Sequence, residues 1–413
     1  MSLLQYGSNL PISKVSVSFD QPRRMVFGPN CVENVGSEAK RLGAGEILLV
    51  TDKGVVKAGL AERVLEILGR DQLKVTVYDN IAAEPTVESV NAAVDFARAD
   101  AYKLVIGLGG GSALDSAKMC ANMITNPGDP MDYVNPAEDR FKKPSVPKIL
   151  IPTTAGTGSE VTNYAVVIEK QTMYKTWAAS SNCFAECAVI DPTMTLTCPP
   201  RVTAGSGMDV AGHSMEGLIS RESNPLSDAL AMEAVKLVFR NLRKAYHNGD
   251  DLEARAGMSM AATFGGMVIA YPWIGGPAIL GHCIAEALGP KFGIPHGVAV
   301  ALALPFILEY NLPACTEKIA SFAACLGLDT SGLSVREAAS KVPRAVFQLM
   351  EDVELPTGLK QVNVPKAFLT PFTEYLVKER QYMYSLPKYN PTMLTIENIA
   401  QLLERMYEGA LGS

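Results

Sequence analysis

Positive charge is in short supply in this chain. Its 413 residues include 37 Lys and Arg against 43 Asp and Glu, which gives a net charge of -6. A nucleic-acid surface needs a concentrated basic field, so this composition argues against nucleic acid as a partner. Long apolar runs are lacking too, since stretches such as 297–308 are too short to cross a bilayer. We therefore expect neither nucleic acid nor a membrane as a partner.

An export signal and a disulfide framework are also missing. Residues 1–8 contain no basic region followed by an apolar core. The eight cysteines are scattered through apolar segments. The one close pair, Cys183 and Cys187, lacks a second pair at zinc-finger spacing. Free thiols are typical of a reducing compartment, so we expect a cytoplasmic protein.

Histidine is scarce, with only four in the chain, and three of these fall in one pattern. Asp209 precedes His213 by four residues, which places both side chains on one face of a helix. His282 and His296 follow in apolar segments bounded by Gly and Pro, whereas His247 lies in a polar loop. One carboxylate and three imidazoles can surround a divalent first-row cation and leave a position open for a substrate oxygen. A single histidine is more typical of a core or capping residue, but together these four residues predict a metal site.

The first half of the chain alternates strands with helices. Strands are expected over 46–51, 74–78, 104–108 and 148–152, and helices over 32–42, 60–68, 87–97 and 112–123. This alternation predicts βαβ units and a mostly parallel, Rossmann-like sheet. The segments 15–19 and 25–27 are expected to form a hairpin at a sheet edge. An exposed edge must be paired or covered, so a partner subunit is expected there, in a homodimer or a higher homo-oligomer.

Strand patterns end near Asp191-Pro192 and Pro199-Pro200. Helical periodicities follow over 205–220, 226–246, 252–271, 276–289, 297–310, 315–326, 334–352, 366–379 and 394–409. We place a domain boundary near residue 195, with an α/β domain over 1–195 and an all-helical domain over 196–413. The predicted metal ligands lie wholly in the helical half, where several helices can bring them together.

Two polar, glycine-rich segments follow expected strands. The first comprises Gly109, Gly110, Gly111 and Ser112, and the second comprises 153–159 with Thr153, Thr154, Thr157 and Ser159. Glycine lets the backbone approach a phosphate, and the N–H groups at a helix start favour its charge. Ser112 stands where G-x-G-x-x-G would have its third glycine, and either segment alone is also typical of a plain turn. Two such loops at the carboxyl ends of parallel strands predict a diphosphate-containing cofactor.

Asp52, at the end of the first clear strand, is suited to two roles. Its carboxylate can accept a hydrogen bond from a ribose 2′-hydroxyl and would repel a 2′-phosphate, which favours NAD over NADP. Aspartate is equally apt as a helix N-cap, and one residue can do both.

In these motifs the sequence resembles the iron-containing (group III) alcohol dehydrogenases, within the superfamily that includes glycerol dehydrogenases and dehydroquinate synthases. The likeness covers nearly the whole chain and is carried by 109–118, 152–161, 207–216, His282 and 295–297. It implies an N-terminal dinucleotide-binding domain, a C-terminal all-helical domain and an active site in the cleft between them. It assigns metal binding to Asp209, His213, His282 and His296. The cofactor contacts that it implies are Asp52, Gly109, Gly110, Gly111, Ser112, Asp115, Thr153, Thr154, Thr157, Ser159 and Lys175.

The activity implied is metal-dependent, NAD-linked oxidation of a small alcohol, with reduction of an aldehyde or ketone as the reverse. The resemblance favours Fe(II), while the ligand set also suits Zn(II) and other divalent metals. A polyol or hydroxy-acid dehydrogenase is the nearest alternative. A dehydroquinate synthase-type lyase would need basic residues for a substrate phosphate, and the helical half shows no basic cluster beside the metal motifs. A regulator without activity conflicts with retention of all four ligands.

Glu286 is the one informative departure from the family pattern. Many members have a histidine there, four residues after the third metal ligand and close to the nicotinamide. The glutamate can bind a cationic or hydroxylated substrate, orient His282 or accept a proton, and we count it among the candidate catalytic residues. The alternative is a glutamate on a helix surface. Candidate pocket residues are Tyr164, Trp273, Ile274, Pro277 and Ile279, all of which are equally suited to packing.

Overall fold

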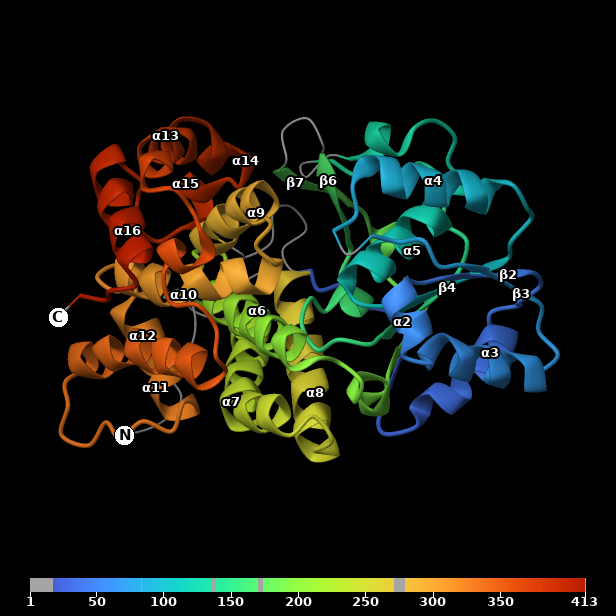
Figure 1. Ribbon diagram of the computed structural model, residues 1–413, viewed down its shortest axis with the longest axis horizontal. Coiled ribbons are helices and arrows are strands. Elements are labelled where there is room, and N and C mark those ends of the chain that lie inside the picture. The colour runs from blue at the N-terminus through green and yellow to red at the C-terminus, as the bar shows by residue number, and fades with distance from the viewer. Residues whose placement is uncertain (1–17, 83, 135–137, 170–173, 271–278, 413) are drawn as a thin grey trace. The chain divides into compact units, whose positions relative to one another are not determined.

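The computed structural model describes residues 18–82, 84–134, 138–169, 174–270 and 279–412 (Figure 1). Its contacts divide the chain into two compact units. The first comprises Asp20–Pro199 with Gly249–Ser259, and the second is built mainly from Pro200–Asn248 and Met260–Ser413. The chain thus passes between the units after Pro199, close to the boundary expected near residue 195. Among the described residues, each helix is too short or too polar to span a lipid bilayer.

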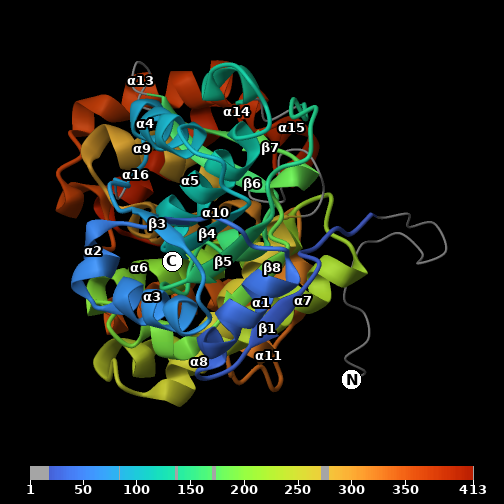
Figure 2. The ribbon, with the colours of Figure 1, turned by 90° about the vertical axis from the view of Figure 1, so that its right-hand side faces the viewer.

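The first unit contains a six-stranded parallel sheet (Figure 2). Its strand order is β1 (Met25–Phe27), β8 (Cys187–Ile190), β5 (Lys148–Pro152), β4 (Leu104–Gly109), β2 (Ile47–Val50) and β3 (Val75–Tyr78). Every neighbouring pair in this sheet is parallel. The sheet and the helical second unit confirm the fold class expected from the sequence.

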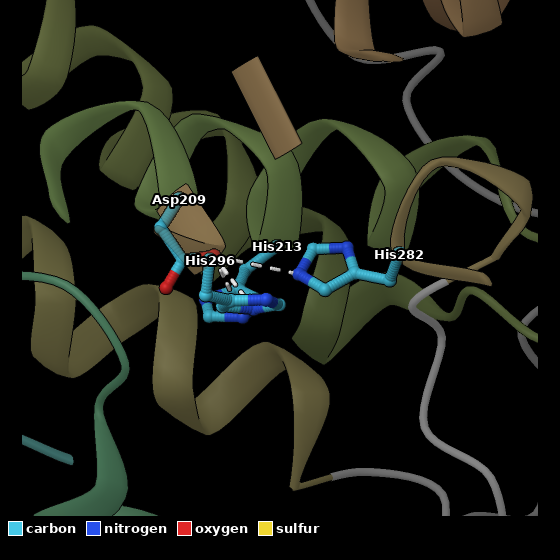
Figure 3. Close-up of side chains that lie close together, drawn as sticks. All are labelled: Asp209, His213, His282 and His296. Atoms are coloured by element: carbon cyan, nitrogen blue, oxygen red, sulfur yellow. Dashed lines mark ion pairs between the residues drawn. The ribbon is translucent and has the colours of Figure 1, made fainter. Parts of the chain in front are cut away.

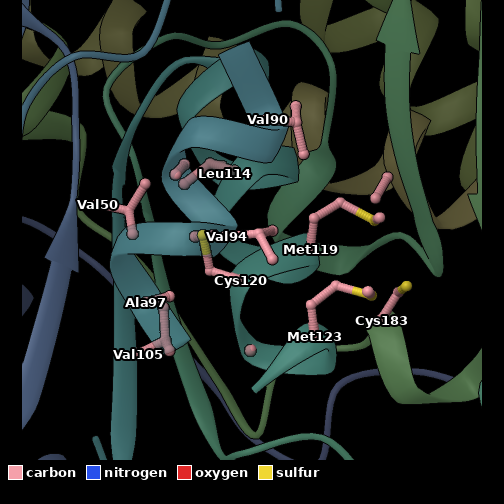
Figure 4. Close-up of a cluster of buried hydrophobic side chains, with 14 of the residues drawn as sticks. Val50, Val90, Val94, Ala97, Val105, Leu114, Met119, Cys120, Met123 and Cys183 are labelled. Carbon is pink, nitrogen blue, oxygen red and sulfur yellow. The ribbon is translucent and has the colours of Figure 1, made fainter. Parts of the chain in front are cut away.

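Helices cover both faces of the sheet because its central strands are apolar on both sides. Ile47 and Leu49 face a core formed with α1 (Val35–Arg41) and α3 (Leu60–Arg70). Leu48 and Val50, the alternate residues of β2, face the opposite core. Figure 4 shows this second core, where α4 (Val87–Arg98) and α5 (Gly111–Met123) pack on the sheet. Continuous burial of β2, β4 and β5 is what a doubly covered parallel sheet requires.

The strand order reverses between β2 and β4. The chain leaves β2 through α2 (Lys53–Lys57) and α3 toward β3 on one side, and leaves β4 through α5 toward β5 on the other. Because the two connections diverge, the carboxyl ends of β2 and β4 flank a topological switch point. Ligands of open α/β sheets bind at such points.

Three strands were not foreseen. The antiparallel pair β6 (Tyr164–Glu169) and β7 (Tyr174–Ala179) forms a separate small sheet, and β8 completes the large one. The hairpin expected over 15–19 and 25–27 is not seen in the described part of that segment. β1 pairs in parallel with β8, residues 18–24 form no strand, and residues 15–17 lie outside the described ranges. The local sequence identified β1 but not its partner, which lies more than 150 residues away.

The second unit is helical. Its main helices are α6 (Pro200–Ile219), α7 (Pro225–His247), α8 (Leu252–Ile269, whose first turns belong to the first unit), α9 (Leu280–Phe292), α10 (His296–Asn311), α11 (Thr316–Cys325), α12 (Val335–Asp352), α13 (Leu369–Tyr375) and α16 (Ile396–Glu408). The short helices α14 (Gln381–Met383) and α15 (Leu386–Tyr389) lie between the last two. α10 is apolar around its whole circumference and is buried from Ala299 to Leu308, as expected of a central helix. The predicted metal ligands lie on α6, α9 and α10.

Candidate metal centre

Asp209, His213, His282 and His296 come together inside the helical unit (Figure 3). Asp209 and His213 lie one turn apart on α6, His282 is in the first turn of α9, and His296 is the first residue of α10. One ligand atom from each residue lies within 4.8 Å of those of the other three. The four residues singled out from the sequence are thus the group that the fold assembles.

The spacing around Asp209 fits an ion better than it fits hydrogen bonds. Oδ1 of Asp209 lies 3.6 Å from Nε2 of His213, 3.5 Å from that of His282 and 3.4 Å from that of His296. Hydrogen bonds between such atoms would measure about 2.7–3.2 Å. Ligand atoms about 2.1 Å from a tetrahedral cation stand about 3.4 Å apart. Oδ1 of Asp209 therefore lies at the separation from all three nitrogens that ligands of a shared divalent ion would have.

Charge at the centre points the same way. Asp209 is buried, as is Glu216 one turn beyond His213, and neither forms a salt bridge with Lys or Arg among the described residues. Burial opposes ionisation of Asp209, but His213 and the other two imidazoles hold the pKa of its carboxyl below the ordinary value. Burial also opposes protonation of His282, yet Glu216 and Asp209 raise its pKa to about 10. Even with the ring of His282 protonated, the two buried carboxylates leave a net negative charge, and a divalent cation that takes the place of that proton would balance both of them.

Glycines let the three helices approach closely enough for this convergence. A Cβ on Gly297 would stand 2.1 Å from the carbonyl oxygen of Gly205, so α10 meets α6 backbone to backbone. A Cβ on Gly212 would stand 2.4 Å from Val300 and 3.3 Å from the ring of His282. Sequence reasoning missed these glycines, because nothing in their spacing says which helices cross.

The two predicted phosphate loops lie against each other in the first unit. The N–H of Thr153 donates to the carbonyl of Gly109 at 2.9 Å, where β4 and β5 end side by side. A Cβ on Gly111 would stand 2.6 Å from Thr157, and one on Gly110 would stand 3.5 Å from Thr154. α5 starts within the first loop, so its N-terminus opens at the same edge. The close approach of the loops explains the glycine at 111, and the helix start offers N–H groups suited to a phosphate.

Asp52 caps a helix and lies beside the glycine loop. Its Oδ1 accepts hydrogen bonds from the N–H groups of Gly54 at 2.8 Å and Val55 at 3.0 Å, which caps α2. Its Oδ2 lies 3.2 Å from where a Cβ on Gly109 would stand. The carboxylate thus borders the glycine loop across the switch point, while one of its oxygens is used in the cap.

Asp115 is buried, and its carboxylate is bonded to other residues of the sheet unit. One of its oxygens accepts from Oγ of Ser159 at 2.6 Å and faces Nζ of Lys118 at 3.0 Å, and the other accepts from the N–H of Val166. Lys118 is fully buried and also bonds to Thr162. Two of the predicted cofactor residues, Asp115 and Ser159, therefore bind each other and fix the second loop to α5.

The remaining predicted residues are more scattered. Lys175 lies on β7, where its Nζ forms an ion pair with Glu84 at 2.9 Å. Ile279 is buried and Tyr164 lies on β6, whereas Trp273, Ile274 and Pro277 lie outside the described residues.

Glu286 has a partner that the sequence did not reveal. It lies one turn beyond His282 on α9, and its Oε2 is 3.5 Å from the guanidinium of Arg380, whose side chain is fully buried. Arg380 ends a π-helical turn over Leu376–Arg380 and also stacks on the ring of Tyr384 at 4.9 Å. Nδ1 of His282 is bonded to Glu216, so Glu286 is not its hydrogen-bond partner. The 94 residues between Glu286 and Arg380 explain why no local pattern pointed to the pair.

Comparison with known proteins places this arrangement in context. The family described as iron-containing alcohol dehydrogenase matches residues 22–192, and its C-terminal domain family matches residues 203–407. Long-chain-alcohol dehydrogenase 1 of Geobacillus thermodenitrificans is 36% identical over 94% of this chain and 98% of its own. The NAD-dependent methanol dehydrogenase of Bacillus methanolicus is 30% identical over 94% of this chain and 99% of its own.

A solved structure agrees in fold. The alcohol dehydrogenase from Oenococcus oeni superposes with a TM-score of 0.88 at 32% identity, covering 95% of this chain and 100% of that one. Both halves of the sequence, the sheet and the helical unit find their counterparts in one kind of enzyme. The chain belongs to the iron-containing alcohol dehydrogenase family.

Proposed function

We propose that this chain catalyses the reversible, NAD-linked oxidation of a small alcohol to an aldehyde or ketone at a single divalent metal ion, with Fe(II) favoured by family membership. The observation that carries the proposal is the cluster of Asp209, His213, His282 and His296, in which the carboxylate oxygen of Asp209 lies 3.4–3.6 Å from all three imidazole nitrogens. When bound, the ion supplies a Lewis acid that lowers the pKa of an alcohol hydroxyl, and NAD supplies the hydride acceptor.

The residues of the chain supply position and electrostatics. Asp209, His213 and His282 are buried on α6 and α9, and His296 is half-buried at the start of α10, so packed helices limit the movement of the ligands. The loops that follow β4 and β5 are assigned to the diphosphate of the cofactor, and Asp52 to its ribose. No side chain of the described residues is assigned as the base that accepts the alcohol proton.

Replacing Asp209 with Asn is expected to remove the charge that holds the ion. Bound iron after anaerobic repletion should fall from about one per chain to a small fraction. Turnover should fall by more than about 100-fold, since even an outer contact to a ligand is commonly worth 10–100-fold. Metal analysis and absorbance of the reduced nicotinamide measure the two effects.

His247→Ala is the matched control, because this exposed histidine contacts the carbonyl of Asp352 and lies outside the cluster. It should retain iron and turnover. Full activity in Asp209→Asn, or in wild-type protein stripped by a chelator, would contradict the proposal.

Asp52 is proposed to select NAD. Asp52→Asn keeps an N-cap for α2, because Asn caps helices about as well as Asp, but removes the charge that repels a 2′-phosphate. The ratio of kcat/KM with NADP to that with NAD should rise about 10-fold, which corresponds to about 1.4 kcal/mol of repulsion. The unfolding temperature should change little. An unchanged coenzyme ratio would show that Asp52 acts only as a cap.

Glu286 is proposed to accept a hydrogen bond from a second hydroxyl of the substrate. Arg380 already balances its charge, so an uncharged hydroxylated substrate suits the pair better than a cationic one. Accepting this bond would make a diol a better substrate than the matching monoalcohol. Hydrogen bonds to charged groups contribute about 1.5–3 kcal/mol, which corresponds to a preference of roughly 10–100-fold.

The ratio of kcat/KM for 1,2-propanediol to that for 1-propanol measures this preference. Glu286→Gln should lower the ratio. The double variant Glu286→Leu with Arg380→Met should abolish the preference for the diol, and it leaves no buried charge uncompensated. Iron content serves as the control and should stay unchanged. An equal ratio in all three proteins would exclude Glu286 as the acceptor.

We also propose that two copies of the chain associate along β1. Ala188 donates to the carbonyl of Arg24, and Gly28 donates to Ile190, so these flanking residues of β1 bond to β8. Alternation along a parallel strand then directs the backbone groups of Met25 and Phe27 away from β8. Met25 and Phe27 are 42% and 40% exposed. An open edge with exposed apolar side chains is suited to a second copy.

Light scattering should give a mass of about twice 44.2 kDa for the wild type. Met25→Lys with Phe27→Lys should shift the mass to that of one chain while leaving the unfolding temperature nearly unchanged, because edge charges prevent strand pairing. A dimer that persists in this variant would place the interface elsewhere.

All eight cysteines are free thiols, which supports a reducing, cytoplasmic location for the enzyme.

A further inference from the structure

Glu216 contacts the metal centre through one of its ligands. It lies on α6, three residues after His213, and is fully buried. Its Oε1 is 2.8 Å from Nδ1 of His282. Its Oε2 accepts from the backbone N–H groups of Ile279 at 2.8 Å and Gly281 at 3.0 Å, with that of His282 at 3.4 Å. One carboxylate thus holds both the ligand and the start of its helix.

The backbone contacts replace a missing helix cap. The first N–H groups of a helix have no partner within the helix and need an acceptor. Ile279 occupies the N-cap position of α9, and its apolar side chain cannot provide one. The carboxylate of Glu216 takes this place from another helix, and its charge also suits the positive end of the α9 dipole.

The contact to Nδ1 determines how His282 presents its other nitrogen. A carboxylate accepts only, so Nδ1 must carry the proton and donate it to Glu216. In the neutral ring, the form that binds a metal ion, the lone pair is then on Nε2, which lies 3.5 Å from Oδ1 of Asp209 and has no hydrogen-bond partner. His213 differs, because its Nδ1 has no hydrogen-bond partner in the structure. His282 is therefore fixed in tautomer and in orientation by a contact that His213 lacks.

Gly281 provides the space that this contact needs. A Cβ at this position would stand 2.4 Å from Oε1 of Glu216 and 2.9 Å from its carboxyl carbon. Any side chain at 281 would push the carboxylate away from His282. Glu216 and Gly281 therefore form a matched pair at the join between α6 and α9.

We propose that Glu216 is the positioning residue of the metal centre. It fixes the tautomer and direction of His282 and supplies the second of the two buried negative charges, so that with Asp209 the centre is matched to a divalent cation. The inference rests on the proposed function, because it assumes that His282 is a metal ligand. A purely structural Glu216 would stabilise α9 without affecting the bound ion.

Cobalt(II) distinguishes these possibilities, because its visible absorption reports the geometry of its ligands. In Glu216→Gln, the side-chain amide must present either an N–H group to the backbone donors or one to Nδ1 of His282. We expect Co(II) to bind about 10–100-fold more weakly than in the wild type, as is typical when a partner of a metal-bound histidine is lost. We also expect an altered visible spectrum. Gly281→Ala should alter the spectrum in the same way, which keeps the test valid if Glu216→Gln folds poorly.

Two control variants separate positioning from stability. Glu38→Gln removes a buried carboxylate that pairs with Arg24 and Arg41 in the sheet unit, and Gly69→Ala adds a Cβ where no atom lies within 4 Å. Both should retain the wild-type Co(II) affinity and spectrum, whatever their unfolding temperature. If Glu216→Gln and Gly281→Ala lower the unfolding temperature but keep the wild-type affinity and spectrum, Glu216 only caps α9 and the inference is wrong. If the wild-type chain itself binds no Co(II), the proposed function fails instead.

Discussion

The arrangement of the helical unit depends on one buried carboxylate, that of Asp209, around which three imidazoles converge from α6, α9 and α10. Asp209 is buried, and among the described residues it forms no ion pair with Lys or Arg. Its neighbours are His213, His282 and His296, whose nitrogens lie too far from its carboxylate for good hydrogen bonds. Such an arrangement is costly without a cation, because each polar group has lost water and gained little in return. A bound cation would compensate these buried groups, so we infer that the helical unit binds an ion at this site.

The packing of the helices serves this centre. Helices with full-sized side chains at their crossings normally lie 8–10 Å apart. Glycine at 205, 212 and 297 removes the side chains that would separate α6 from α10 and crowd His282. At 281 it admits the carboxylate of Glu216 instead. The same residue type thus does two jobs, allowing backbone contact in one place and a buried hydrogen-bond network in the other.

The sheet unit follows a separate logic. Its apolar strands place their polar and glycine-rich ends at one edge, where Asp52 and Gly109 meet across the switch point between β2 and β4. The sequence motifs assign several residues of these loops to cofactor binding, but some of these residues instead form hydrogen bonds with one another that hold the loops in place. Asp115 is the clearest case, since its carboxylate is used by Ser159, Lys118 and Val166. A residue in a cofactor motif can therefore act by shaping the loop.

The sequence by itself determined the fold class, the strands β2, β3, β4 and β5 of the large sheet, most helices and the residues of the candidate metal cluster. These follow from local periodicity and from the rarity of histidine, both of which can be read without knowing which segments meet. Tertiary structure decided what depends on contacts between distant residues. It paired β1 with β8, placed Arg380 beside Glu286 and brought the carboxylate of Glu216 within hydrogen-bond distance of His282. Spacing along the chain carries no signal for such contacts, because they arise only when separate helices and strands are packed against one another.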